Sequence, residues 1–238
     1  MELKTIARIY NDFPTKFGLP RQSGMADDLI SRIIMKKEYR NPEAFRGIEE
    51  FEYIWLLWIF EPMGKREWSP TVRPPKLGGN RRMGVFATRS PNRPNPIGLT
   101  RVKLISVEHT SDEGVVLTVS GADLMSGTEI VDIKPYLSFA DSVPDAASGE
   151  YGADSQKIYE VSIPESVAEL FSGEQLKALR EVLSYDPRPG YQDDAERVYG
   201  FAYGGYDIKF KVREGVVEVI GASPAENQKN LKINQKNS

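Results

Sequence analysis

The sequence predicts a mostly β protein, in which an antiparallel β-barrel is followed by a small α+β domain. About seven strand-like segments precede residue 140 with few helical patterns between them, which favours an antiparallel barrel or sandwich over a βαβ array. The segment that follows is small, polar and turn-prone. After it the pattern changes to helical spacing and then to three further strands. At 238 residues the chain can bury a sizeable core.

Apolar runs or apolar–polar alternation mark each strand of the first part. These segments are Leu3–Tyr10, Leu29–Met35, Phe51–Phe60, Met83–Thr88, Ile97–Val107, Val115–Ser120 and Ile130–Lys134. Between the second and third, Asn41 followed by Pro42 is typical of a helix start, because asparagine caps and proline suits the first helical position. We therefore expect one short helix there.

The second part begins with a helical pattern over residues 164–184, which Ser172-Gly173 breaks in two. A hairpin around Gly204-Gly205 and a third strand follow. The strands are Tyr199–Tyr203, Ile208–Val212 and Val216–Ile220. We expect a barrel domain at 1–140, a linker at 141–157, an α+β domain at 158–221 and a disordered tail at 222–238.

Composition excludes several kinds of chemistry. The chain has no cysteine and one histidine, His109 in an apparent turn, so it lacks the residues for a thiolate nucleophile or a Cys/His metal site. No Walker or dinucleotide glycine motif occurs, which disfavours kinases, ATPases and Rossmann methyltransferases. There is no apolar run of about 20 residues and no signal-peptide pattern. We expect a cytoplasmic protein without metal or membrane contact.

Residues 84–99, called here the Pro-Arg loop, combine rigidity with planar hydrogen-bond donors. Pro91, Pro94 and Pro96 fix their own backbone angles, and Arg89 and Arg93 are carried on that stiffened backbone. The flanking apolar runs indicate a connection between two buried strands. A plain connection that discourages edge pairing is the alternative. Because loops carry binding sites more often than packing roles, the pattern favours function.

Charge is unevenly distributed. The chain carries a net charge of −3, but the segment from Gly64 to Lys103 carries ten basic residues against one acid. Such asymmetry predicts a positive face for a polyanion, and a solvated strand surface is the alternative.

Several motifs together resemble the TsaA/TrmO family, whose characterised bacterial members methylate tRNA. The matches lie in the family's order over roughly residues 3–215, and because several agree the resemblance is stronger than any one motif. They are Pro20–Gln22, Pro70–Asn80, Arg89–Gly98, Asp123–Thr128, Asp132–Tyr136 and Asp186–Tyr191. The resemblance implies a non-Rossmann barrel, S-adenosylmethionine as methyl donor and a homodimer. It also implies tRNA as partner, methylated on N6 of threonylcarbamoyl-adenosine 37 in the anticodon loop.

The resemblance also implies a set of cofactor-binding residues. These are Pro20, Arg21, Gln22, Glu61, Arg89, Asp123, Leu124, Gly127 and Thr128. The planar fork of Arg21 suits the cofactor's carboxylate, and a surface arginine after a proline turn is the alternative. Two positions depart from the family pattern: Glu61-Pro62 stands where relatives carry His-Gln, and Ser126 replaces an aspartate.

For the reaction, strand alternation places Asp132 and Lys134 on one face, near Tyr136. Asp132 is expected to accept the N6 proton or to orient the base, and Tyr136 to stack on the adenine or cofactor. An exposed ion pair is the alternative for Asp132 and Lys134. Expected tRNA contacts are Arg81, Arg82, Arg93, Asn95, Arg188 and Tyr191. For the motif that presents Arg188 and Tyr191, a helix-capping turn is the alternative.

Two other functions remain open at this point. One is an S-adenosylmethionine-dependent methyltransferase of the same fold acting on another substrate. The other is a non-catalytic module that senses S-adenosylmethionine or binds RNA.

Overall fold

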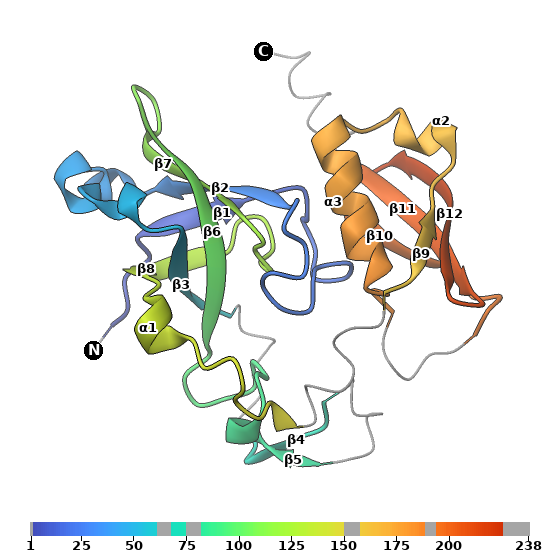
Figure 1. The fold of residues 1–238 in the computed structure, drawn as a ribbon, viewed down its shortest axis with the longest axis horizontal. Helices are drawn as coiled ribbons and strands as arrows, with labels where there is room; N and C mark the ends of the chain where they lie inside the picture. The colour runs from blue at the N-terminus through green and yellow to red at the C-terminus, as the bar shows by residue number, and fades with distance from the viewer. Residues whose placement is uncertain (1, 61–67, 75–81, 150–157, 189–193, 226–238) are drawn as a thin grey trace.

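The first part of the chain is a closed six-stranded antiparallel barrel in the computed structural model, which describes residues 2–60, 68–74, 82–149, 158–188 and 194–225 (Figure 1). Neighbouring strands pair in the order β1-β2-β7-β6-β3-β8, and β8 closes the barrel on β1. The strands are β1 (Ala7–Tyr10), β2 (Ile30–Met35), β3 (Tyr53–Ile59), β6 (Ile97–Thr110), β7 (Gly114–Ser120) and β8 (Glu129–Pro135). The predicted fold class is confirmed.

Strand alternation builds the barrel core. On β3, Ile54 and Leu56 point inward and are fully buried, while Tyr53 and Trp55 lie on the outer face. Aliphatic side chains from the other strands meet them, including Ile9, Ile33, Leu117 and Ile130. The barrel is therefore filled by side chains, and binding chemistry is confined to its ends and its outer surface.

The connections carry short elements. They are η1 (Lys37–Tyr39), η2 (Pro42–Phe45), η3 (Ile48–Glu50), β4 (Thr71–Val72), β5 (Met83–Gly84), η5 (Val85–Ala87) and α1 (Ser138–Asp141). The helix predicted after Asn41 is present as the 3₁₀ helix η2, and the Asn41 side chain accepts a bond from Glu43 N at 3.1 Å.

The strand predicted over Met83–Thr88 is wrong beyond Gly84. The chain instead turns through η5 and leaves Phe86 74% exposed. The Thr88 hydroxyl donates to the Val85 carbonyl at 2.8 Å, so a local side-chain bond replaces strand pairing.

The second part is a four-stranded sheet, ordered β10-β11-β12-β9, with a helix packed on it. Its elements are β9 (Glu160–Ser162), α2 (Glu165–Ala168), α3 (Gly173–Ser184), β10 (Tyr199–Tyr203), β11 (Tyr206–Arg213) and β12 (Val216–Pro224). The predicted break at residues 172–173 is confirmed, because Ser172 and Gln175 form a capping box that starts α3. Within the described ranges no helix is long and apolar enough to cross a membrane.

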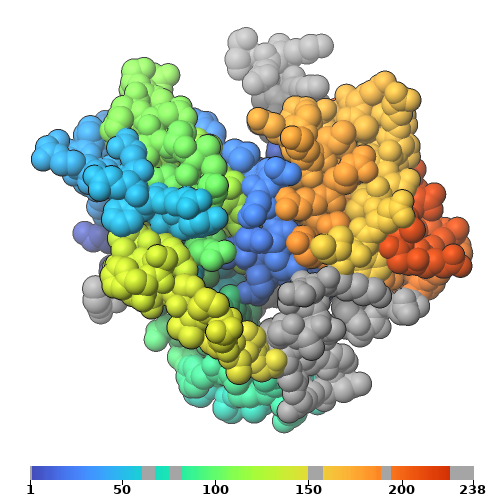
Figure 2. Space-filling model, in the orientation of Figure 1, coloured from blue at the N-terminus to red at the C-terminus, as the bar shows by residue number. Residues whose placement is uncertain are grey.

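Residues 11–29, the N-terminal loop between β1 and β2, join the two parts. Phe13, Ala26 and Leu29 are buried in one cluster with the side chains of α3 and the β10–β12 sheet. The Gly204 N–H donates to the Asp12 carbonyl at 3.0 Å across the same seam. The blue segment between the barrel and the orange helix in Figure 2 is this loop. The core of the second part therefore includes side chains of the N-terminal loop and is called here the shared core, whereas a separate cluster fills the barrel.

Candidate functional site

Three predicted site residues meet where the N-terminal loop, the Pro-Arg loop and the 123–128 loop come together. Gln22 Oε1 accepts a bond from Arg89 Nη1, and Gln22 Nε2 donates to the Arg21 carbonyl at 2.7 Å. The Arg89 charge acts on the Asp123 carboxylate, which also bonds the Ser23 backbone. The sequence places these loops about 35 to 100 residues apart, so the fold itself assembles this cluster.

Asp123 is held from within the barrel. Thr100 Oγ1 donates to Asp123 Oδ1 at 2.7 Å, and Trp58 Nε1 donates to the same hydroxyl oxygen at 3.0 Å. Burial raises the pKa of Asp123 above its usual value, while the Thr100 bond and the Arg89 charge partly oppose that shift. Neither Trp58 nor Thr100 was predicted from the sequence as a site residue. Alternation with the apolar residues Val102 and Leu104 is the signal that would have placed Thr100 on the inner face of its strand.

Gly98 allows this arrangement. A Cβ at this position would lie 2.1 Å from the Trp58 indole ring, so only glycine lets the ring lie flat on the strand. The indole N–H consequently reaches Thr100, two residues along β6.

The 123–128 loop is pinned to the barrel rim. Ser126 N donates to the Phe13 carbonyl at 2.8 Å, and Gly127 N donates to the Ile9 carbonyl at 2.7 Å. Thr128 Oγ1 donates to the Met125 carbonyl at 2.8 Å. Of the loop's predicted residues, Leu124 packs into the barrel core and is 1% exposed, so only its backbone is available to a ligand.

The Pro-Arg loop is stiffened by hydrogen bonds of its own. Ser90 N and Asn92 N donate to the Thr88 and Ser90 hydroxyls at 3.3 and 3.2 Å. Arg93 N donates to the Pro91 carbonyl at 2.8 Å. Arg93 is half-buried in this loop, whereas Asn95 and Arg82 are exposed.

Three predicted residues lie outside the described ranges, and they are Glu61, Arg81 and Tyr191.

The predicted catalytic residues lie on the outer barrel face. Lys134 Nζ and Asp132 Oδ2 form an ion pair at 2.9 Å, and both side chains are largely exposed. The Tyr136 ring lies 5.7 Å from that of Trp55 and 6.1 Å from that of Tyr53. These three rings, the aromatic platform, offer a stacking surface.

Arg101 links the aromatic platform to the N-terminal loop. Its guanidinium lies over the Tyr53 and Tyr136 rings, 5.0 and 5.7 Å from their centroids. A Cβ at Gly24 would lie 3.2 Å from Arg101 Nη2, so the same side chain touches the N-terminal loop. From the sequence, Arg101 is only one of the ten basic residues between Gly64 and Lys103. Its position on β6, opposite Trp55, is the signal that could have found it.

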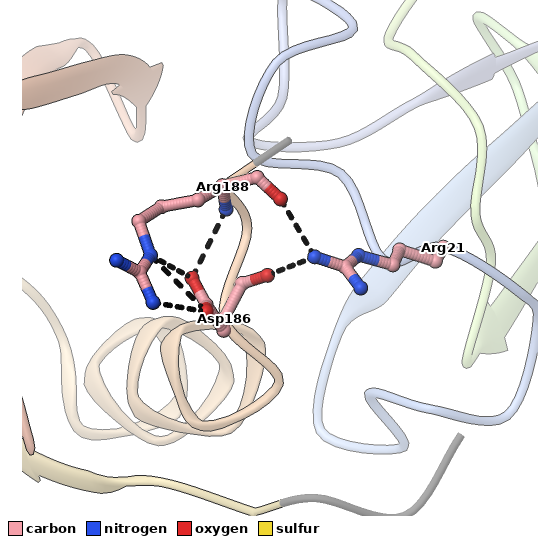
Figure 3. Close-up of polar contacts among 3 residues, drawn as sticks. All are labelled: Arg21, Asp186 and Arg188. Carbon is pink, nitrogen blue, oxygen red and sulfur yellow. Dashed lines mark hydrogen bonds and ion pairs between the residues drawn. The ribbon is translucent and has the colours of Figure 1, made fainter. Parts of the chain in front are cut away.

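Arg21 is engaged by the end of α3. Its Nη2 donates to the Asp186 carbonyl and, at 2.7 Å, to the Arg188 carbonyl (Figure 3). Arg188 was predicted to be presented to tRNA by this turn, but its side chain is 7% exposed and paired with Asp186 Oδ2 at 2.8 Å. That expected placement is corrected. Pro20, which precedes Arg21, is buried.

A metal centre has no counterpart in the described part of the chain, where no three His, Cys, Asp or Glu side chains gather as ligands. The cluster instead offers a guanidinium, an amide and a partly buried carboxylate within reach of one another. Such a set binds a small zwitterionic or hydroxylated ligand by directed hydrogen bonds.

Comparison with known proteins identifies both parts of the chain. The model of the tRNA-methyltransferase O N-terminal domain matches residues 8–142, and that of the TrmO C-terminal domain matches residues 156–225. The tRNA (adenine(37)-N6)-methyltransferase of Escherichia coli is 38% identical over 231 residues, which cover 94% of this chain and 98% of that protein.

Two further relatives extend this comparison. A protein of Pyrococcus abyssi named probable S-adenosyl-L-methionine-binding protein is 31% identical over 134 residues, 56% of this chain and 67% of that protein. The crystal structure of TrmO from Pseudomonas aeruginosa superposes with a TM-score of 0.75 at 29% identity, covering 94% of this chain and 97% of that one.

Proposed function

The chain belongs to the TrmO family of tRNA methyltransferases, and on that basis we propose that it methylates N6 of threonylcarbamoyl-adenosine at position 37 of tRNA. It is an adenine-N6 tRNA methyltransferase, and its methyl donor is S-adenosylmethionine. The observation that carries the proposed site is the meeting of Gln22, Arg89 and Asp123 at the barrel rim.

This cluster fits the methyl donor by its chemistry. S-adenosylmethionine supplies a methyl group activated on a positively charged sulfur. Arg89 is the proposed partner of the donor's carboxylate, because a guanidinium pairs with it bidentately. Asp123 is the proposed acceptor for a ribose hydroxyl or the ammonium, and Gln22 holds Arg89 in place. Pro20, Gly127 and Thr128 shape the rim with their backbones.

The aromatic platform is the proposed stacking surface for the target base. Unstacked RNA bases bind to aromatic side chains and arginine planes, and Arg101 adds such a plane beside Tyr136. Lys134 pairs with the Asp132 carboxylate at 2.9 Å. Asp132 is therefore the proposed group that orients the amino nitrogen or accepts its proton.

The tRNA itself is the proposed partner of the basic segment. Arg82 and Asn95 lie in or next to the Pro-Arg loop, and their exposed side chains can reach the phosphates of the anticodon arm. Arg93 is half-buried in the same loop and is proposed to contact the modified nucleotide.

Methyl transfer to tRNA from cells that lack the gene tests the proposal. We expect mass spectrometry of digested tRNA to show methylated threonylcarbamoyl-adenosine only after incubation with the chain and S-adenosylmethionine. Arg89→Ala should lower the rate by on the order of 10- to 100-fold, because a charged hydrogen bond is lost. Arg46→Ala, an exposed arginine paired only with Glu43 among the described residues, serves as the matched control. Methylation at another nucleoside would contradict the proposal.

A homodimer is the proposed assembly. Phe139 on α1 is 87% exposed, and Leu137 and Val143 beside it are exposed as well. Trp55 Nε1 donates to Asp141 Oδ2 at 2.9 Å, so this apolar patch adjoins the aromatic platform. A second copy of the chain on the patch would bury it next to the proposed target base.

We expect light scattering to give twice the chain mass, and Phe139→Glu to give a monomer, because a charge on the patch opposes its burial. Leu3→Glu, at another exposed apolar residue, is the control and should leave the dimer intact. A dimer that survives Phe139→Glu would place the interface elsewhere.

A further inference from the structure

The turn that ends α3 is closed by its own side chains. Asp186 adopts a left-handed backbone conformation with φ at 47°. Its carboxylate accepts four bonds from Arg188, one from the backbone N–H at 3.2 Å and three from the guanidinium at 2.8 to 3.1 Å. The Arg188 guanidinium also lies 6.0 Å over the Tyr199 ring. The 186–188 turn is therefore fixed by a nearly buried ion pair.

The 186–188 turn directs two backbone carbonyls toward the same nitrogen of Arg21. The Asp186 and Arg188 carbonyls both accept from Arg21 Nη2, as the converging dashed lines of Figure 3 show. A single nitrogen bonded to two carbonyls has little freedom to move, because each bond restricts the direction of the other. The turn thus fixes the tip of the N-terminal loop at Arg21.

From Arg21 the contacts continue into the proposed cofactor site. The Arg21 carbonyl accepts from Gln22 Nε2, and Gln22 Oε1 accepts from Arg89 Nη1. We propose that Asp186 and Arg188 are positioning residues for methyl transfer, which act through Arg21 and Gln22 to hold Arg89 in its binding orientation. This inference rests on the proposed function, because it takes Arg89 as a cofactor ligand.

Other contacts hold the two parts of the chain together, so this network is not needed for their attachment. Phe13, Ala26 and Leu29 are buried in the shared core. Asp28 N donates to Glu181 Oε2 at 2.9 Å, and Gln175 Nε2 donates to Asp12 Oδ1 at 3.0 Å. Breaking the 186–188 turn should therefore disturb Arg89 far more than it disturbs the global fold.

A comparison of the Asp186→Ala and Asp186→Asn variants tests the proposal. Asparagine tolerates the left-handed conformation and keeps one acceptor oxygen, whereas alanine loses both advantages. We expect Asp186→Ala to weaken calorimetric binding of S-adenosylhomocysteine at least tenfold and to raise the KM for S-adenosylmethionine. Asp186→Asn keeps the left-handed turn and one acceptor oxygen but removes the charge that pairs with Arg188, so its binding should lie between that of Asp186→Ala and that of the wild type. Hydrogen exchange at residues 21–24 and 88–93 should rise in the alanine variant without ligand present.

Glu181→Ala is the matched control, because it removes a bond across the same seam that does not lead to Arg89. It should leave both binding and exchange at residues 88–93 unchanged. Arg188→Lys is a second variant in case Asp186→Ala does not fold. It keeps the positive charge but loses the forked pairing with Asp186, so it should also weaken the binding of S-adenosylhomocysteine.

The two hypotheses fail differently. A wild-type chain that binds no S-adenosylhomocysteine contradicts the proposed site. A wild type that binds it, with Asp186→Ala or Arg188→Lys binding equally well and exchanging equally slowly, contradicts the positioning role alone.

Discussion

Transfer RNA that carries threonylcarbamoyl-adenosine is expected to be methylated at least about 100-fold faster than the same tRNA with plain adenosine at position 37. The threonyl group brings a carboxylate into the site. Arg93 is the proposed cation for it, since Lys134 is already paired with Asp132 and Arg89 is assigned to the carboxylate of the methyl donor. Plain adenosine would leave that cation without a partner, which is why the discrimination should be large.

Single-turnover rates on the two tRNAs measure this discrimination. Arg93→Gln should reduce the ratio mainly by slowing the modified substrate, whereas Arg82→Gln, an exposed arginine outside the Pro-Arg loop, should slow both substrates alike. Equal rates on the two wild-type substrates would instead favour a methyltransferase with another target. Binding of both tRNAs without transfer would favour a non-catalytic module.

Gly18→Ala is expected to lower the free energy of unfolding by about 3 kcal/mol or more. Gly18 has a φ of 94°, which costs an L-residue about 1–2 kcal/mol. A Cβ there would also lie 2.4 Å from Phe201 Cδ2. The Phe201 ring is packed between Phe13 and Phe210 in the shared core and cannot move aside. Strain and overpacking therefore add at this position.

Urea unfolding measures the effect, and Gly47→Ala provides a matched control. Gly47 also has a positive φ, 84°, but the nearest atom to its added Cβ is Glu50 Oε1 at 3.9 Å. This control isolates the backbone strain and should cost only about 1–2 kcal/mol. If the two variants were equally destabilised, contact with Phe201 would contribute nothing, and the seam would be looser than the structure indicates.

Local patterns predicted most of the fold because the barrel strands alternate and the helix start at Ser172 has its own cap. The strand β9 escaped prediction, because three residues that pair in parallel with β12 leave almost no periodic signal. The error at Met83–Thr88 has a similar origin. An apolar run favours a strand, but the hydroxyl of Thr88 offers the backbone a competing bond.

The candidate site was predictable only in part. The motifs brought Gln22, Arg89 and Asp123 into consideration, and the fold brings them together. The sequence does not indicate which atoms an arginine side chain will bond. The bonds from Arg21 to two backbone carbonyls, and the burial of Arg188 against Asp186 in the same turn, therefore became known only from the structure. The Trp58–Thr100–Asp123 chain also needed the closed barrel, since its members lie on different segments.

Phe13 has a consequence for the order in which the protein is made. It leaves the ribosome early, yet its partners Phe201 and Tyr203 are synthesised 188 and 190 residues later. During that interval the Phe13 side chain has no core to pack into. The N-terminal loop at the barrel rim can therefore become ordered only when the last strands emerge. A nascent chain stopped before β10 would therefore carry a barrel whose rim at the proposed site is incomplete.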